Sequence, residues 1–274
     1  MSTEGVLALV STPIGNLGDL SPRAVATLAA AELVLAEDTR HSRHLLDHAG
    51  IRVPLESLHE HNEAARTPVL VERLLAGAQM ALISDAGTPL VSDPGARLVH
   101  AAIEAGVRVV PIPGPSAVLA ALVASGLPSD RFTFLGFLPR KGKERRALIN
   151  EIAESRHTVV VYEAPGRVGE TLGELAAAGM GERAAAVARE LTKQYEEVRR
   201  GTLAELAAYY GADAPRGEVV LVISGAAPRV LDEAALTALA DEWRAAGLPA
   251  RDIMQRLTEG HAAPRNLAYR LAHR

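Results

Sequence analysis

Short apolar runs alternate with amphipathic stretches along the first 112 residues of the chain. The apolar runs have the length of strands and are continuous, which is typical of a parallel sheet covered by helices on both faces. Ser21 with Pro22, and Asp93 with Pro94, each pair a helix-capping side chain with a proline and so predict helix starts. The pattern predicts strands at residues 5–11, 32–36, 79–84 and 107–111, and helices at 22–31, 39–49, 62–76 and 94–105.

The pattern of apolar and polar residues changes after the Ile-Pro-Gly-Pro segment at residues 112–115, where we expect a domain junction. Two closely spaced strands on either side of Thr192 predict a hairpin, and a hairpin among crossover connections makes the second sheet mixed. Strands are expected at residues 131–136, 158–162, 184–190, 196–201 and 218–224, and helices at 116–125, 143–155, 168–178 and 203–210.

Only helices are expected beyond residue 231, at residues 233–246, 250–258 and 264–272. The chain is therefore predicted to be an α/β protein with a largely parallel sheet in the first domain, a mixed sheet in the second and a small C-terminal helical extension. The predicted domains cover residues 1–115, 116–228 and 229–274.

Composition excludes several classes of site. The chain has no cysteine, which excludes disulfides, thiolate nucleophiles and Cys-ligated zinc, and its histidine spacing predicts no metal site. We recognise no signal peptide, and no apolar run reaches the roughly 20 residues that cross a bilayer, so we expect a cytoplasmic protein without a membrane partner. The net charge of −4 gives no general attraction to nucleic acid, so any such binding depends on local clusters of basic residues.

Four loops follow predicted strands or the domain junction, where α/β sheets bind ligands. They occupy residues 11–19, 37–40, 84–95 and 113–117. None contains the G-x-G-x-x-G dinucleotide fingerprint. Taken singly, each loop also has an ordinary structural explanation as a tight connection, an acidic helix start, a long turn or a rigid linker.

One basic cluster stands out, with five basic residues among the eight at positions 139–146. It lies where a loop enters a predicted helix, so its charges are expected to be accessible to phosphates, although a solvated helix face is the alternative. Aromatic residues make up only 3% of the chain, which favours recognition through phosphate and shape over base stacking. The basic residues of the cluster are Arg140, Lys141, Lys143, Arg145 and Arg146.

In this order and spacing, eight segments resemble the ribosomal RNA small subunit methyltransferase I family, a branch of the tetrapyrrole-methylase superfamily. The resemblance runs from about residue 7 to the C-terminus and is carried by residues 12–19, 37–40, 59–63, 84–95, 113–117, 162–165, 189–193 and 217–222. It implies a two-domain tetrapyrrole-methylase-like fold with S-adenosylmethionine held between the domains. It also implies a homodimer that methylates the 2′-hydroxyl of a cytidine in 16S ribosomal RNA of the 30S subunit.

Carried over by position, the resemblance also implies site residues. The loop with Pro13, Gly15 and Asn16 would line the substrate trough. Arg40 and the basic cluster are candidate substrate contacts because of their charge, not because of the resemblance. The family commonly has Tyr-Glu-x-Pro-His-Arg where this chain has Gly166 in the histidine position, so no role is carried over to that residue. The implied cofactor-binding residues are Asp85, Ala86, Gly87, Thr88, Pro89, Pro113, Gly114, Pro115, Ser116, Ala117, Tyr162, Glu218, Val219 and Val220.

A ribose hydroxyl is a poor nucleophile at neutral pH, so some group must accept its proton as attack develops. A lysine could do so only if burial or neighbouring cations lowered its pKa. The sequence does not select among the candidates, which are Glu37, Asp38, Asp85, Glu190 and Lys193.

Two other functions remain open at this point. A tetrapyrrole C-methyltransferase would share the fold and cofactor, but the motifs at residues 37–40 and 59–63, the basic cluster and the helical extension disfavour it. An RNA-binding assembly factor with a decayed cofactor site is disfavoured by the intact loops around Asp85 and Pro113.

Overall fold

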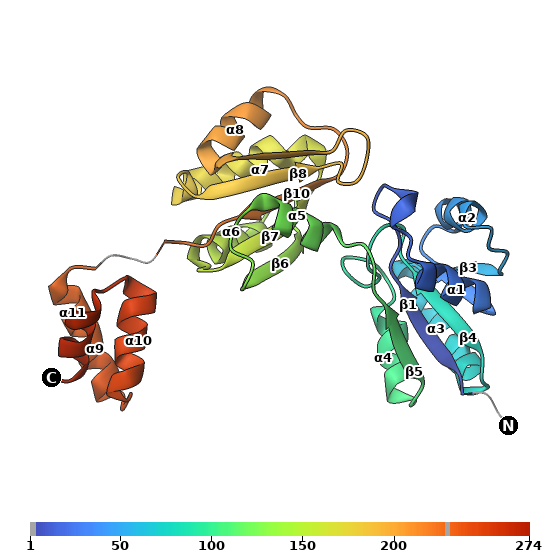
Figure 1. The fold of residues 1–274 in the computed structure, drawn as a ribbon, viewed down its shortest axis with the longest axis horizontal. Coiled ribbons are helices and arrows are strands. Elements are labelled where there is room, and N and C mark those ends of the chain that lie inside the picture. The colour runs from blue at the N-terminus through green and yellow to red at the C-terminus, as the bar shows by residue number, and fades with distance from the viewer. Residues whose placement is uncertain (1–3, 228–230) are drawn as a thin grey trace.

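The computed structural model describes residues 4–227 and 231–274, which form three lobes in a row (Figure 1). The predicted boundary between residues 228 and 229 lies outside the described residues. The lobes hold a parallel sheet, a mixed sheet and a group of helices, which confirms the predicted fold class.

All strands of the first sheet are parallel, in the order β3-β2-β4-β1-β5. The three-residue edge strand β3 was not predicted, because a run that short has no legible period. The elements are β1 (Val6–Val10), α1 (Pro22–Ala30), β2 (Leu33–Ala36), α2 (Thr39–His48), β3 (Leu55–Ser57), α3 (Glu60–Leu75), β4 (Gln79–Ile83), α4 (Ala96–Glu104) and β5 (Arg108–Ile112).

Helix starts show which capping predictions were right. The Ser21 hydroxyl accepts a hydrogen bond from the Ala24 amide at 3.1 Å, as expected for the cap of α1. The cap predicted at Asp93 is wrong, because α4 begins only at Ala96 and its N-cap residue is Gly95, with φ at 117°. A left-handed backbone there suits glycine and leaves the Asp93 carboxylate free for another role.

The second sheet has the order β6-β7-β10-β8-β9, and only the β6–β7 pair is parallel. The predicted hairpin is the antiparallel pair β8–β9. The elements are α5 (Ala117–Ser125), β6 (Phe132–Phe137), α6 (Lys143–Glu154), β7 (Thr158–Glu163), α7 (Val168–Leu175), β8 (Ala184–Arg189), β9 (Glu197–Thr202), α8 (Leu203–Ala212) and β10 (Val219–Ile223). Short helical turns lie at Leu17–Asp19, Pro165–Arg167 and Ala176–Met180.

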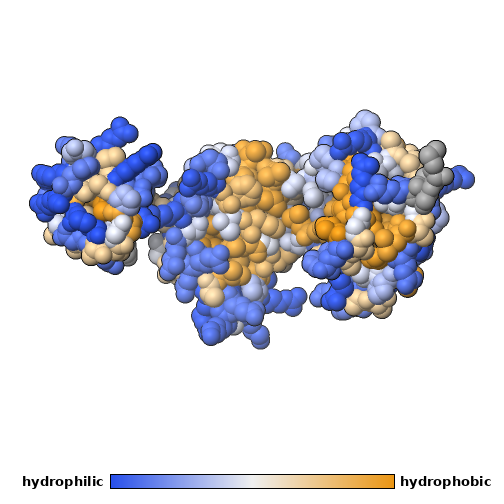
Figure 2. Space-filling view, turned by 90° about the horizontal axis from the view of Figure 1, so that it is seen from below, coloured by the Kyte–Doolittle hydropathy of each residue, from blue (hydrophilic) through white to orange (hydrophobic). Residues whose placement is uncertain are grey.

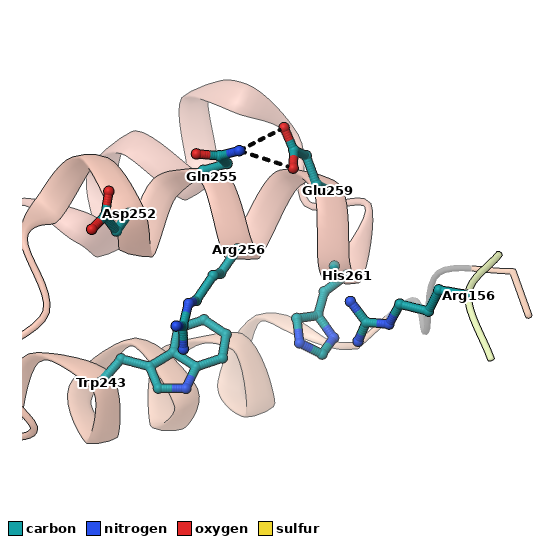
Figure 3. Close-up of a pocket in the computed structure, with 8 residues that line it drawn as sticks. Arg156, Trp243, Asp252, Gln255, Arg256, Glu259 and His261 are labelled. Atoms are coloured by element: carbon teal, nitrogen blue, oxygen red, sulfur yellow. Dashed lines mark hydrogen bonds between the residues drawn. The ribbon is translucent and has the colours of Figure 1, made fainter. Parts of the chain in front are cut away.

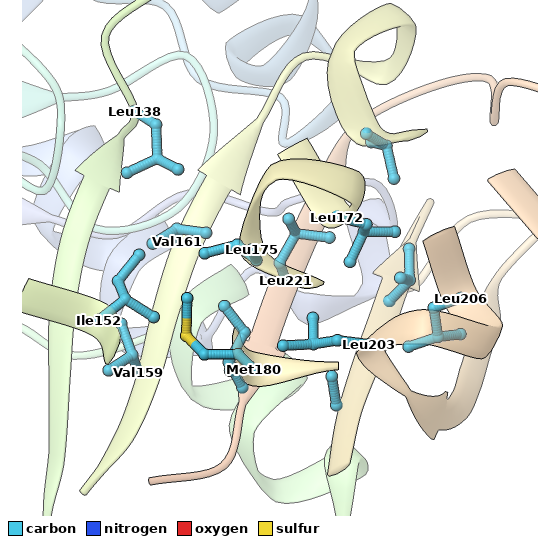
Figure 4. Close-up of a cluster of buried hydrophobic side chains, with 14 of the residues drawn as sticks. Leu138, Ile152, Val159, Val161, Leu172, Leu175, Met180, Leu203, Leu206 and Leu221 are labelled. Atoms are coloured by element: carbon cyan, nitrogen blue, oxygen red, sulfur yellow. The ribbon is translucent and has the colours of Figure 1, made fainter. Parts of the chain in front are cut away.

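Helices cover both faces of this second sheet. On one face, Ile152 of α6, Leu172 of α7 and Leu203 of α8 pack with Val161 and Leu221 of the strands (Figure 4). On the other face, α5 packs against β7, β8 and β10 in a cluster that also includes Ile14 from the first lobe. Each such fully buried side chain stabilises the fold by about 1.5–3 kcal/mol, and Ile14 ties the two sheets together.

The third lobe consists of α9 (Glu233–Ala245), α10 (Ala250–His261) and α11 (Arg265–Ala272), close to the predicted bounds. Leu236, Ile253, Leu257 and Leu271 form its own small core. In the described ranges, residues 4–227 and 231–274, none of the helices combines the length and the apolar character needed to span a bilayer.

Candidate active site

A cavity of about 400 Å³ lies between the first two lobes, within the size range of small-molecule sites. The first lobe contributes residues that follow the carboxyl ends of β1, β2 and β4, the edge where parallel α/β sheets bind ligands. The lining residues are Ile14, Glu37, Asp85, Ala86, Val91, Ser92, Asp93, Ala117, Phe137, Tyr162, Glu163, Ala164, Pro165, Gly217, Glu218, Val219 and Val220.

Three carboxylates of the first lobe, Glu37, Asp85 and Asp93, face this cavity. Burial, followed by the negative charges of Glu37 and Asp85, raises the pKa of Asp93 to about 6. Burial and then the charge of Asp85 also raise the pKa of Glu37. The part of both shifts that comes from neighbouring carboxylates shows that like charges lie close together here, so a positively charged ligand would be stabilised in this cavity.

Tyr162 of β7 and Phe137 of β6 form an aromatic wall, with ring centroids 5.3 Å apart. A bulge between Phe134 and Phe137 shifts the strand register, and Gly136 adopts a φ of 65° within it. The bulge re-aims Phe137 toward the cavity, as bulges near sites commonly do. Burial, with Asp93 and Glu218, raises the pKa of Tyr162 to about 12, so its phenol stays protonated.

Glu163, at the end of β7, is held by a buried polar network. Its carboxylate accepts hydrogen bonds from the Thr171 hydroxyl at 2.6 Å and the Ala164 amide at 2.8 Å. Arg145 lies 4.0 Å from the same carboxylate and also donates to Thr171 at 2.9 Å and to Glu174 at 2.7 Å. This network fixes the turn that carries the cavity wall at residues 164 and 165.

The expectation that Arg145 is accessible to phosphate is therefore wrong, since only 4% of the residue is exposed. A guanidinium can be buried when carboxylates and hydroxyls satisfy it, and no sequence pattern separates it from its exposed neighbours. The rest of the basic cluster is exposed, namely Arg140, Lys141, Lys143 and Arg146.

Lys193 lies in the β8–β9 hairpin, beside the mouth of the cavity. Its ammonium donates to Glu190 at 2.9 Å and to Glu218 at 3.1 Å. Burial alone would lower the pKa of Lys193, but these carboxylates outweigh it and leave the pKa raised. The Gly15 backbone packs so closely that a Cβ there would lie 2.3 Å from Lys193 Cγ, so the hairpin and the first loop meet at this point.

Asp38 and Arg40 pair with each other away from the cavity lining. Asp38 caps α2 and accepts from the Arg40 amide at 2.8 Å and from its guanidinium at 3.0 Å. These hydrogen bonds lower the pKa of Asp38 to about 2. The Asp38 amide in turn donates to the Asp85 carboxylate at 3.2 Å, which positions Asp85 in the cavity.

Backbone strain gathers around the same space. Leu90 and Ser92 from the first lobe adopt φ values of 72° and 66°, and Glu190 and Thr192 of the hairpin adopt 49° and 67°. Left-handed backbone is unfavourable for residues with side chains and concentrates at ligand sites. The strained residues thus mark both sides of the cavity as a functional region.

The candidate base Glu37 and seven of the cofactor-binding residues implied by the resemblance line the cavity, namely Asp85, Ala86, Ala117, Tyr162, Glu218, Val219 and Val220. The remaining cofactor candidates lie outside the lining, namely Gly87, Thr88, Pro89, Pro113, Gly114, Pro115 and Ser116. There Gly87 pairs with Thr12, Thr88 donates to the Pro115 carbonyl at 3.1 Å, and Ser116 caps α5. They hold the loops in place around the cavity.

Sequence reasoning missed Asp93 and Phe137 as lining residues. The local sequence predicts a helix cap at Asp93, and the position of Phe137 depends on a bulge that no periodicity reveals. Pro13 and Asn16 lie in the loop after β1, outside the lining. Among residues 4–227 and 231–274, no three histidine or acidic side chains gather closely enough to hold a metal ion.

Comparison with known proteins places this geometry in a family. The model of the Tetrapyrrole (Corrin/Porphyrin) Methylases matches residues 6–207. A Synechocystis protein named ribosomal RNA small subunit methyltransferase I is 47% identical over 98% of this chain and 97% of its own. A Mesorhizobium japonicum protein of the same name is 54% identical over 85% of this chain and 79% of its own.

Solved structures show the same fold. Uroporphyrin-III C-methyltransferase from Thermus thermophilus, solved with S-adenosylhomocysteine, aligns with a TM-score of 0.56 at 22% identity. The alignment covers 80% of this chain and 97% of that protein. With the sheet topology, the cavity at the strand ends and these relatives, the chain belongs to the tetrapyrrole methylase family, in the branch whose members are named ribosomal RNA small subunit methyltransferase I.

Proposed function

We propose that this protein is a cytoplasmic S-adenosylmethionine-dependent enzyme that methylates the ribose 2′-hydroxyl of a cytidine in 16S ribosomal RNA of the 30S subunit. The observation that carries the proposal is the acidic and aromatic cavity between the sheets of a chain 47–54% identical to ribosomal RNA small subunit methyltransferases.

The cavity fits S-adenosylmethionine, which is cationic at its sulfonium and ammonium groups. Glu37, Asp85 and Asp93 supply negative charge, and no lysine or arginine is among the described lining residues. Apolar Val91 and Val220 with Tyr162 supply surface for a flat ring. A fold relative was solved with S-adenosylhomocysteine. When bound, the cofactor supplies an activated methyl group for an in-line displacement by the nucleophile.

The chain's own residues position the reactants and accept a proton. Positioning alone can supply about 7–11 kcal/mol of the barrier. Of the five candidate proton acceptors, Glu37 and Asp85 line the cavity. The raised pKa of Glu37 makes it a better proton acceptor than an ordinary carboxylate. We therefore assign Glu37 as the general base.

The other catalytic candidates suit different roles. Asp38 is committed to Arg40 and to capping α2, and its pKa is lowered by those hydrogen bonds. Lys193 is a stable cation with a raised pKa, and its hydrogen bond lowers the pKa of Glu190. The pair Lys193–Glu190 therefore holds the rim of the cavity, next to Gly15 of the substrate loop.

The RNA would approach from the side of the exposed basic residues Arg140, Lys141, Lys143 and Arg146. They lie in the loop before α6 and in its first turn, shortly after Phe137 of the cavity wall. Phosphate contacts of this kind fix the register of a substrate RNA without reading its sequence.

The homodimer part of the proposal rests on an apolar face of the second lobe. Leu119 and Val123 of α5 are 52% and 72% exposed, and Phe132 of β6 is 39% exposed. Figure 2 shows apolar side chains gathered over the middle lobe, which carries these elements. Exposed apolar patches mark interaction sites, so Val123→Asp is expected to convert a dimer into a monomer in light-scattering measurements.

Methyl transfer from labelled S-adenosylmethionine tests the function, with unmodified 30S subunits and uroporphyrinogen III as parallel acceptors. Label is expected in the RNA of the subunits and to be lost in Glu37→Gln. Label found only on the tetrapyrrole would overturn the proposal and favour a C-methyltransferase. Arg146→Gln, at an exposed position outside the cavity, is expected to lower the label through weaker RNA binding while cofactor binding stays intact.

A further inference from the structure

A second cavity, of about 550 Å³, lies between the helical third lobe and the turn that joins α6 to β7 (Figure 3). Only Arg156 comes from the second lobe, and the other lining residues come from α9 and α10. They are Trp243, Asp252, Gln255, Arg256, Glu259, Gly260 and His261. The cavity belongs to neither the cofactor site nor the exposed basic cluster before α6.

Flat and cationic side chains meet in this second cavity. Trp243 is the only tryptophan of the chain, and the Arg256 guanidinium lies 5.5 Å from the centroid of its ring. The His261 ring lies 6.1 Å from Trp243, inclined by 32°. Indole, imidazole and guanidinium planes are the surfaces on which unpaired bases stack.

Arg156 adds an exposed positive charge on the opposite side of the cavity, next to His261 (Figure 3). Its guanidinium lies beside Gly260, where a Cβ would approach Nη1 to 2.8 Å, so the glycine leaves room for the arginine. The Nδ1 atom of His261 is buried and has no hydrogen-bond partner among the described residues. A hydroxyl or base edge entering beside Arg156 could provide one.

The lining also holds two acidic residues, Asp252 and Glu259, and Figure 3 shows both away from Arg156. Both carboxylate oxygens of Glu259 accept from the Gln255 amide at 3.1 Å, and Figure 3 shows that pair apart from Trp243 and Arg156. Two arginines around a tryptophan provide sites for a phosphate and for a flat ring at one place.

We propose that this second cavity holds a single unpaired nucleotide of the RNA substrate, with the base against Trp243 and Arg256 and the phosphate on Arg156. The proposal rests on the proposed RNA function and extends it to the third lobe. The cavity volume lies within the range of small-ligand sites, and a nucleotide uses both the stacking surface and the charge. The helical lobe would then provide a second RNA-binding site, separate from the cofactor cavity.

The sole tryptophan gives a direct readout. A short single-stranded RNA is titrated into the full-length protein while Trp243 fluorescence is recorded, with inorganic phosphate and a double-stranded RNA of equal length as parallel titrants. The single-stranded RNA is expected to quench the fluorescence to saturation. The double strand and phosphate alone are expected to leave it nearly unchanged.

Variants then locate the binding. Arg156→Ala and Arg256→Ala change exposed side chains and are each expected to weaken RNA binding roughly tenfold. Arg156→Ala is also expected to lower the salt dependence by about one phosphate contact. Arg251→Ala, an exposed residue of α10 outside the lining, is the matched control and should change affinity little. Gly260→Ala should weaken RNA binding as Arg156→Ala does, because the added methyl group displaces the Arg156 guanidinium. The positive charge of Arg156 is kept in this variant.

The readout does not depend on methyl transfer, so the two proposals fail separately. Methylation of 30S subunits with no quenching and unchanged affinity in both arginine variants would overturn the second site alone. An equal loss in Arg251→Ala, or saturation by phosphate alone, would also overturn it, since the cavity would then act only as general charge. Quenching without methylation would support the nucleotide site and contradict the proposed enzymatic function.

Discussion

The cavity between the sheets and the cavity beside the helical lobe differ in chemistry. The cavity between the sheets carries Glu37, Asp85 and Asp93 at the strand ends, whereas the one beside the helical lobe carries Arg156 and Arg256 around Trp243. The first therefore suits a cation and the second an anion with a flat ring. In the proposed function, one chain of net charge −4 separates a site for a cationic cofactor from surfaces for a polyanion, a division that overall charge alone does not reveal.

Their construction differs as well. The wall of the first cavity rests on the buried Glu163–Arg145 network, whereas the arginines of the second are exposed. Arg145→Met leaves the Glu163 charge buried without a full set of partners and is expected to cost about 3–5 kcal/mol of folding stability. Arg146→Met changes an exposed neighbour and should stay within about 0.5 kcal/mol. Urea unfolding of both variants measures the difference, and equal small effects would show that the network is dispensable.

The negative charge of the first cavity is expected to select the cationic cofactor over its neutral thioether product. Asp93→Asn should weaken S-adenosylmethionine binding by about 1.5–3 kcal/mol, the usual range for a charged partner. S-adenosylhomocysteine, which lacks the sulfonium charge, should lose less. Calorimetric titration of both ligands measures this, with Arg256→Ala as a control that leaves both affinities intact. An equal loss for the two ligands would argue against charge selection.

Asp93 should also make folding stability depend on pH. Its pKa is raised from 3.8 to about 6, so the folded state binds this proton more tightly than the unfolded state. Between these values, unfolding releases the proton, and stability contributed by Asp93 falls as pH rises. Asp93→Asn should therefore be more stable than the parent above pH 6 and indistinguishable below about pH 4. A thermal unfolding series across this range checks the sign, and a benefit confined to low pH would refute it.

The smallest effect is expected at Lys193, where charge rather than proton transfer matters. Because Glu190 and Glu218 hold its ammonium and its pKa is raised, Lys193→Arg should keep methyl transfer within a few-fold of the parent. Lys193→Met should lose more, since two carboxylates would remain unpaired at the rim. Arginine is never neutral at physiological pH, so inactivity of Lys193→Arg in the methyl-transfer assay would restore lysine as the base.

The contrast between the cavities also shows which features of the fold and the sites can be predicted from the sequence. Continuous apolar strands and capped helices predicted the two sheets closely, because burial on both faces and capping leave local patterns, as at Ser21. The resemblance led to Asp85, Tyr162 and Glu218 in the lining. The prediction at Asp93 was wrong because an aspartate before a proline can either cap a helix or face a ligand. The structure distinguishes the two roles, since the N-cap residue of α4 is the left-handed Gly95.

Long-range contacts account for the other differences. Arg145 differs from Arg146 only in facing Glu163 and Thr171, which lie far along the chain. Trp243 and Arg156 are likewise distant in sequence, so the second cavity had no local signal at all. Periodicity records which side of an element is buried, but it does not record which residue of another element lies opposite.

The measurement that tests the central claim most directly is nucleoside analysis of 16S ribosomal RNA after incubation of unmodified 30S subunits with the protein and S-adenosylmethionine. We expect 2′-O-methylcytidine in the digest of the parent reaction and its absence with Glu37→Gln. A methyl group on a base instead of a ribose, or no methylated nucleoside while the protein still binds S-adenosylmethionine, would contradict it.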